Sequence, residues 1–253
     1  MSHVGYKDQV VWIIGASSGI GHALASELAE RGAILALSAR RREGLEDIIR
    51  SDKRRGAVFV LDATDADIVR RTAQAICAAY GRIDRVIFLA AAYTPMKMDA
   101  LDLAVARQIV DTNISAAFNV IHAVMPIFRQ QNTRVQVALC GSIAGYIGLP
   151  GGQPYSATKA AVINLAESLY AECSDNIDVK LISPGFVRTP LTDKNSFNMP
   201  FMIEPEQAAK EIARGLLSSR FEIHFPKKMT LLLKIVRFLP YWISLRLIRT
   251  IKA

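Results

Sequence analysis

Cysteine is scarce in this sequence, and the patterns missing around it exclude several classes of protein. Among 253 residues there are three cysteines, Cys77, Cys140 and Cys173, which lie far apart and form no C-x-x-C pair. Disulfide frameworks and zinc fingers need paired ligands, so we expect neither a disulfide nor a metal site. The N-terminus has no charged leader followed by an apolar run and a cleavage site, which predicts a cytoplasmic chain in a reducing compartment.

Acidic residues are absent from the last part of the sequence. From Lys227 to the C-terminus there are seven lysines and arginines and no aspartate or glutamate, which leaves 24 basic and 23 acidic residues for the rest. The net charge of +8 is therefore concentrated in the tail. Because the body is close to neutral, we expect no nucleic acid among the partners.

The same tail, residues 227–253, is apolar but lacks a long uninterrupted hydrophobic run. Internal charges and Pro240 break any apolar stretch of about 18 residues, which argues against a membrane-spanning helix. On a helix, basic residues fall on one face while Ile235 and Phe238 fall on another. This pattern fits helices in the interface of an anionic membrane, on its inner face, and it fits equally well a helix docked on the body or on a neighbouring subunit. A disordered tail is a third alternative.

Short runs rich in valine and isoleucine alternate with longer segments of helical periodicity. The runs are apolar throughout, which indicates strands covered on both faces, as in a parallel sheet. The sequence therefore predicts an α/β fold, with one domain around a doubly wound parallel sheet over residues 1–226 and an amphipathic helical extension over residues 227–253. The expected strands cover residues 10–14, 33–38, 57–61, 85–90, 134–140, 177–183 and 220–225, and the expected helices cover residues 19–31, 42–52, 65–80, 99–130, 155–173 and 205–218.

A glycine-rich turn, residues 15–21, follows the first predicted strand and precedes a helical pattern. Glycines permit close approach of the backbone, and the free amides of a helix N-terminus attract a pyrophosphate. The spacing is G-x-x-x-G-x-G, and no lysine follows the last glycine, so the turn is not a P-loop. A tight turn without a ligand is the alternative. The expected contacts with a dinucleotide are Gly15, Ser17, Ser18, Gly19 and Ile20.

No carboxylate follows the second predicted strand, where a site for NAD would place one for the ribose 2′-hydroxyl. The sequence there is Ser38-Ala39-Arg40-Arg41-Arg42. A guanidinium can hold a 2′-phosphate with two parallel hydrogen bonds, whereas a carboxylate would repel it. Arg40 therefore indicates NADP(H) as the cofactor, while Arg41 and Arg42 fit a solvated helix start.

A phenol and an ammonium stand four residues apart after a second glycine-rich turn. Tyr155 and Lys159 would share one face of a helix. An ammonium beside a phenol favours the phenolate, so we expect the pKa of Tyr155 to fall below its usual value of about 10 and the residue to exchange protons near neutral pH. Alone, the pattern also fits an ordinary surface helix.

Three further features strengthen the chemical interpretation. Ser142 follows the fifth predicted strand, Asn113 lies in a helical pattern that asparagine disfavours, and a P-G-x-V-x-T segment, residues 184–189, follows the sixth strand. In their order along the chain, the glycine turn, Asn113, Ser142, the Y-x-x-x-K pair and this segment resemble the short-chain dehydrogenase/reductase family over residues 8–226. The resemblance implies a Rossmann-like fold and hydride transfer between a nicotinamide and an alcohol or carbonyl carbon.

The resemblance also implies roles for individual residues. Tyr155 would be the general acid/base, and Lys159 would lower its pKa and hold the nicotinamide ribose. Ser142 would orient the substrate oxygen, and Asn113 would hold a water that links Lys159 to solvent. The other implied cofactor contacts are Asp62 beside the adenine, Ala63, Ala90 and Ala91 near the ribose, and the nicotinamide segment with Pro184, Gly185, Val187 and Thr189.

Two positions depart from the family pattern. Ile14 stands where the family usually has threonine, and Phe88-Leu89-Ala90-Ala91 replaces its Asn-Asn-Ala-Gly turn. In the family these two motifs contact each other through hydrogen bonds. Replacing both polar partners can be nearly neutral, so we expect an apolar contact in their place and cofactor binding through the backbone.

The segment 190–203 follows the nicotinamide motif and is rich in phenylalanine and methionine. It fits a mobile lid over an apolar substrate. The prediction is an NADP-dependent dehydrogenase or reductase for a hydrophobic alcohol or ketone, and the resemblance implies a homodimer or homotetramer formed through the helices at 99–130 and 155–173. The alternatives are a non-catalytic NADP sensor and a membrane-associated binding protein on the same fold.

Overall fold

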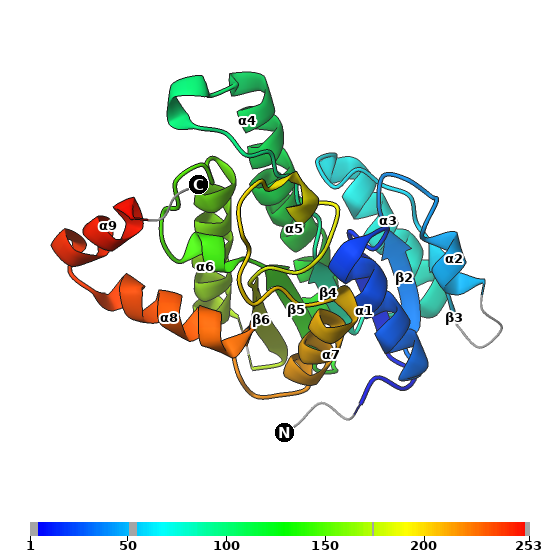
Figure 1. Cartoon of the computed structure of the whole chain (residues 1–253). Coiled ribbons are helices and arrows are strands. Elements are labelled where there is room, and N and C mark those ends of the chain that lie inside the picture. The colour runs from blue at the N-terminus through cyan, green and yellow to red at the C-terminus, as the bar shows by residue number, and fades with distance from the viewer. Residues whose placement is uncertain (1–4, 51–54, 174, 251–253) are drawn as a thin grey trace.

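A parallel β-sheet lies at the centre of the molecule (Figure 1). The computed structural model describes residues 5–50, 55–173 and 175–250. In these residues seven strands pair in the order β3-β2-β1-β4-β5-β6-β7, which confirms the predicted doubly wound sheet. The strands are β1 (Val10–Ile14), β2 (Ile34–Ser38), β3 (Arg55–Val58), β4 (Arg85–Phe88), β5 (Val135–Cys140), β6 (Ile177–Pro184) and β7 (Glu222–Phe225).

Helices cover both faces of the sheet. Successive residues of β1 alternate between two buried clusters, with Trp12 in the cluster under α3, α5 and α6 and Ile13 in the cluster under α1, α2 and α7. This two-sided burial explains why the strands are apolar throughout. The helices are α1 (Gly19–Glu30), α2 (Glu46–Ile49), α3 (Ala66–Tyr80), α4 (Leu103–Val110), α5 (Ala116–Gln130), α6 (Tyr155–Glu172), α7 (Pro205–Leu216), α8 (Lys227–Phe238) and α9 (Tyr241–Arg249).

Three elements differ clearly from the sequence prediction. The helix expected over 42–52 is only the short α2, Glu46–Ile49, and residues 51 and 52 of that prediction lie outside the described residues. Strand β3 ends at Val58 rather than at residue 61, although the amide of Leu61 still donates to the carbonyl of Ala39 at 3.1 Å and its side chain is buried at the carboxyl edge of the sheet. The helix expected over 99–130 is divided into a 3₁₀ turn, α4, a π-helical segment (Asp111–Ser115) and α5. Asn113 lies in that π-helical segment, and such segments are frequent at functional sites.

The C-terminal extension forms two helices that meet at Pro240. The inner face of α8 docks on the body, where Thr230 and Leu233 are buried, and Lys234 forms an ion pair with Glu222 of β7. Docking on the body, one of the interpretations left open by the sequence, therefore holds for one face of α8. Within the described part of the chain, no helix combines the length and the apolarity needed to cross a bilayer.

The backbone of the glycine turn passes very close to the end of β4. Gly15 has a φ of +94°, and a Cβ placed on it would lie 2.6 Å from the backbone nitrogen of Ala90. The amide of Leu89 donates to the carbonyl of Ile14 at 2.8 Å. Ile14 is buried, and Ala90 packs against the apolar cluster to which Ile14 belongs. An apolar contact thus occupies the place where the family resemblance implies a polar pair.

Ile14→Thr is expected to destabilise the protein by about 1–3 kcal/mol, because it removes buried methyl groups and brings a hydroxyl into an apolar cluster. Urea unfolding followed by circular dichroism measures the change. Ile14→Val, which adds no polar group, should lower the unfolding free energy by about 0.5–1.5 kcal/mol. A threonine variant as stable as the wild type would show that a polar partner is available at this junction and that the apolar pairing is incidental.

Candidate active site

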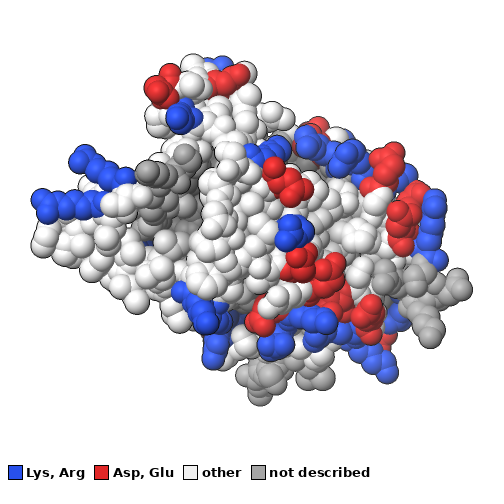
Figure 2. All heavy atoms as spheres, in the orientation of Figure 1, with Lys and Arg blue, Asp and Glu red and all other residues white. Residues whose placement is uncertain are grey.

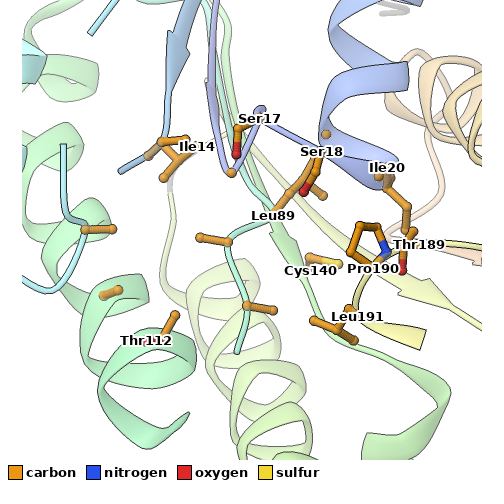
Figure 3. Close-up of a pocket in the computed structure, with 18 of the residues that line it drawn as sticks. Ile14, Ser17, Ser18, Ile20, Leu89, Thr112, Cys140, Thr189, Pro190 and Leu191 are labelled. Atoms are coloured by element: carbon orange, nitrogen blue, oxygen red, sulfur yellow. The ribbon is translucent and has the colours of Figure 1, made fainter. Parts of the chain in front are cut away.

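A cleft of about 720 Å³ opens at the carboxyl ends of the strands, beside the point where the strand order reverses between β1 and β4. Figure 3 shows Ser17, Ser18 and Ile20 on one side of it, with Thr189, Pro190 and Leu191 nearby. With the exception of Asn113, every site residue expected from the sequence lines this cleft. They are Gly15, Ser17, Ser18, Gly19, Ile20, Arg40, Asp62, Ala63, Ala90, Ala91, Ser142, Tyr155, Lys159, Pro184, Gly185, Val187 and Thr189.

The backbone of the glycine turn and the start of α1 can accommodate an anion. Gly19 has a φ of +53°, and a Cβ on it would lie 2.8 Å from Cγ2 of Thr189, so a side chain there would strain the backbone and meet the nicotinamide segment. Ser18 is the N-cap of α1, but its side chain makes no capping hydrogen bond. The amides of the first turn of α1 are therefore not capped by Ser18 and can bind a phosphate at the helix N-terminus.

Basic side chains lie at the end of the cleft that follows β2. Arg40 and Arg41 are exposed, both line the cleft, and neither forms a hydrogen bond or an ion pair with another described residue. Arg42 instead pairs with Glu46 at 3.2 Å. The prediction of a solvated helix start fits Arg42, whereas Arg41 also reaches the cleft. Asp62, a carboxylate in the same lining, accepts hydrogen bonds from the amide and the hydroxyl of Thr64 at 3.0 and 2.8 Å.

Three polar side chains meet at the other end of the cleft. Tyr155 is the first residue of α6, and Lys159 lies one turn later, with Nζ 5.5 Å from the centre of the Tyr155 ring. Ser142 follows β5, and its hydroxyl accepts a hydrogen bond from the amide of Ala144 at 3.1 Å. A phenol, a hydroxyl and an ammonium at one end of a cleft can bind an oxygen atom and exchange a proton with it.

The pKa values of the tyrosine and the lysine correct one expectation from the sequence. Burial raises the pKa of Tyr155 well above its usual range, and a hydrogen bond from Ser142 opposes this only in part. Burial also lowers the pKa of Lys159, whose Nζ donates to the carbonyl of Cys140 at 2.8 Å. The expected lowering of the Tyr155 pKa by Lys159 is therefore wrong for this arrangement, because burial dominates and the ammonium is bonded to a backbone carbonyl.

Asn113 is fully buried and does not line the cleft. Its Oδ1 accepts from the amide of Ala92 at 2.7 Å, and its Nδ2 donates to the carbonyl of Ala92 at 3.1 Å and to the hydroxyl of Thr158 at 2.9 Å. The side chain thus ties the loop after β4 to the helix that carries Tyr155 and Lys159. A water held by Asn113 stays a prediction.

Tyr93 is a site residue to which the sequence gave no role. Its ring packs edge-on against Tyr155 with centroids 5.0 Å apart, and its hydroxyl donates to Oδ1 of Asn195 at 2.6 Å. Lys194 also donates to the carbonyl of Tyr93, at 2.7 Å. The one available signal was its position shortly after β4, three residues beyond Ala90. Tyr93 does not itself line the cleft, and the lining residues not expected from the sequence include Ile14, Leu89, Thr112, Cys140, Leu191 and Thr192.

The segment 190–203 is expected to form a mobile lid, and backbone pairing holds its two ends close together. Val187 pairs with Ile203, and the amide of Ile203 donates to the carbonyl of Phe186 at 3.1 Å. Within the segment, Phe197 packs against Phe186 with ring centroids 5.8 Å apart. Its motion stays a prediction. Among the described residues, no group of three or more histidine, cysteine, aspartate or glutamate side chains could hold a metal ion.

Comparisons with known proteins agree with this geometry. The family model for short chain dehydrogenases matches residues 9–199. An uncharacterized oxidoreductase of Myxococcus xanthus is 32% identical over 247 residues, which cover 95% of both chains. An 11-beta-hydroxysteroid dehydrogenase of Arabidopsis thaliana is 32% identical over 196 residues, 75% of this chain and 55% of that protein.

Solved structures share the fold. A short chain dehydrogenase/reductase from Burkholderia phymatum in complex with NAD has a TM-score of 0.86 at 19% identity, covering 95% of this chain and 96% of that one. A short chain dehydrogenase from Burkholderia cenocepacia in complex with NADP has a TM-score of 0.83 at 23% identity, with 96% and 98% covered. The sheet, the cleft and the matched sequence together place this chain in the short chain dehydrogenase family of oxidoreductases.

Proposed function

We propose that the protein transfers a hydride between NADP(H) and the alcohol or carbonyl group of a hydrophobic substrate. The observation that carries the proposal is the convergence of Tyr155, Ser142 and Lys159 at one end of the cleft whose other end holds the glycine turn and Arg40. A protonated phenol, a polarising hydroxyl and an ammonium are the groups that carbonyl reduction requires from a protein.

The residues along the cleft fit a dinucleotide. The glycine turn and the N-terminus of α1 would hold the pyrophosphate, and Arg40, which forms no ion pair with another described residue, would hold the 2′-phosphate. Asp62 and Ala63 would lie at the adenine, and Ala90 and Ala91 at the ribose. The segment with Pro184, Gly185, Val187 and Thr189 would hold the carboxamide. The bound nicotinamide supplies the hydride.

Side chains of the protein would donate the proton and orient the substrate oxygen. Because burial raises the pKa of Tyr155, the phenol stays protonated at neutral pH and can donate to the oxygen as the carbon is reduced. Ser142 would orient that oxygen. The Nζ of Lys159 would exchange the Cys140 carbonyl for the ribose hydroxyls and then favour the phenolate that remains. Asn113 would contribute a water that returns protons from solvent.

The lining near Tyr155 favours an apolar substrate. Tyr93 covers one edge of the Tyr155 ring, and its hydroxyl binds Asn195, whose amide donates to the sulfur of Met199 at 3.3 Å. Phe186 and Phe197 pack edge-on with ring centroids 5.8 Å apart. The similarity to a plant protein named 11-beta-hydroxysteroid dehydrogenase points in the same direction, towards a large apolar alcohol or ketone.

Other features support a reducing compartment and a homo-oligomer. The three cysteines are free, which supports a reducing compartment such as the cytoplasm.

Apolar side chains are exposed on the helices expected to form subunit contacts, with Leu103 and Val110 on α4, Phe118 on α5 and Tyr170 on α6. Pairing of these helices with a second copy would cover them, which supports a homodimer or a homotetramer.

Tyr155→Phe should lower kcat for ketone reduction by about 100-fold or more while NADPH affinity stays unchanged, because only the proton path is removed. NADPH oxidation with a panel of apolar ketones measures the rate, and fluorescence titration measures the affinity. Tyr170→Phe, an exposed tyrosine on the same helix, is the matched control and should keep the wild-type rate. A Tyr155→Phe variant with more than about a tenth of the activity would contradict the proton-donor role. Tight NADPH binding without oxidation by any ketone in the wild type would instead favour a sensor.

Arg40→Asp should lower the ratio of kcat/KM for NADPH to kcat/KM for NADH by about tenfold or more, since a carboxylate repels the 2′-phosphate and can accept a hydrogen bond from the 2′-hydroxyl of NADH. Arg42→Asp is the control, because Arg42 pairs with Glu46 and does not line the cleft. An unchanged ratio in the Arg40 variant would overturn the assignment of the 2′-phosphate to this residue.

A further inference from the structure

The C-terminal extension leaves a large apolar surface uncovered. Sixteen large hydrophobic side chains are exposed among the described residues, and eight of them lie in α8 and α9. The most exposed are at the joint between the two helices, where Phe238 is 86%, Tyr241 82% and Trp242 67% exposed. Half of the exposed large hydrophobics are thus concentrated in about a tenth of the chain, which marks an interaction surface.

Helix α8 turns one face to the body, and both helices turn apolar side chains outward. On α8, Thr230 and Leu233 are buried, while Leu231, Ile235 and Phe238, at intervals of four and three residues, are exposed. The ion pair between Lys234 and Glu222 and the contact of Thr230 with His224 at 2.6 Å fix this orientation. On α9 the pattern continues, with Ser244 buried and Trp242 and Leu245 exposed.

The outward face is flanked by positive charge alone. Lys228, Arg237, Arg246 and Arg249 are exposed, and no acidic residue occurs from Lys227 to the C-terminus. Figure 2 shows white and blue atoms, without red, over the part of the molecule that α8 and α9 form in Figure 1. Exposed aliphatic and aromatic side chains flanked by cations are the chemistry of a helix that lies in a membrane interface.

We propose that the outward face of α8 and α9 docks on an anionic lipid surface, with both helices in the plane of the interface. A second copy of this chain is a poorer occupant, because two-fold pairing of the face would bring two sets of cations together without an acidic partner. Anionic headgroups supply the missing charge. Because α8 is already held against β7, docking needs no folding of a disordered tail.

The two tryptophans of the chain allow a direct test. Trp12 is fully buried in β1 and Trp242 is exposed on α9, so contact with lipid can change only the environment of Trp242. The full chain should float with vesicles of phosphatidylcholine and phosphatidylglycerol but weakly with phosphatidylcholine alone. Its tryptophan emission should shift to shorter wavelength and be quenched by brominated lipid. Trp242→Phe should still float but lose both signals.

A charge reversal tests the electrostatic part. Arg246→Glu combined with Arg249→Glu should weaken binding to the anionic vesicles by about tenfold or more, as should high salt. Arg71→Glu, an exposed arginine on α3, is the control and should bind as the wild type does. Absence of binding to anionic vesicles, equal binding to neutral ones, or binding that the double variant retains would each overturn the proposal. An emission shift that follows protein concentration without lipid, with a doubled mass by light scattering, would assign the face to a second copy.

Discussion

The site depends on a buried ammonium that must always have a partner. Lys159 is 1% exposed, and without a hydrogen bond its charge would be strongly destabilised at this depth. The carbonyl of Cys140, the last residue of β5, accepts that bond at 2.8 Å. The bond ties the start of α6 to the carboxyl edge of the sheet and so sets the position of Tyr155. In the proposed function, ribose hydroxyls would offer the same ammonium an alternative acceptor, and the buried lysine would then serve both the fold and a cofactor.

Two close backbone approaches bring the rest of the cleft together around this lysine. A Cβ on Gly145 would lie 2.6 Å from the carbonyl carbon of Lys159, so only glycine lets the turn after Ser142 pack against α6. Gly15 likewise lets the glycine turn approach the backbone of Ala90, because a Cβ on Gly15 would lie 2.6 Å from the Ala90 nitrogen. The groups proposed to bind phosphate and to donate a proton come from segments more than a hundred residues apart, and these two contacts help to place them in one cleft. The apolar pairing of Ile14 with the Ala90 region preserves the second contact without the polar residues that the family resemblance implies.

Much of this could be predicted from the sequence, because the signals were local. Continuous apolar runs gave the strands, and the spacing of glycines and the Y-x-x-x-K pair led to residues that do line the cleft. What could not be predicted depends on contacts distant in sequence. Asn113, in the π-helical segment, forms hydrogen bonds to Ala92 and Thr158, and Tyr93 packs on Tyr155, and neither contact can be read from local sequence. The direction of the Tyr155 pKa shift follows from burial, which spacing does not reveal.

Ultraviolet titration of the Tyr155 phenol tests most directly whether Tyr155, with Lys159 beside it, is the proton donor. The tyrosinate absorbance of the wild type minus that of Tyr155→Phe reports this phenol alone. Without cofactor, the raised pKa of Tyr155 predicts no difference signal below about pH 10. With saturating NADP⁺, release of Lys159 from the Cys140 carbonyl towards the ribose should bring the titration into that range. A titration that cofactor leaves unchanged would contradict the account.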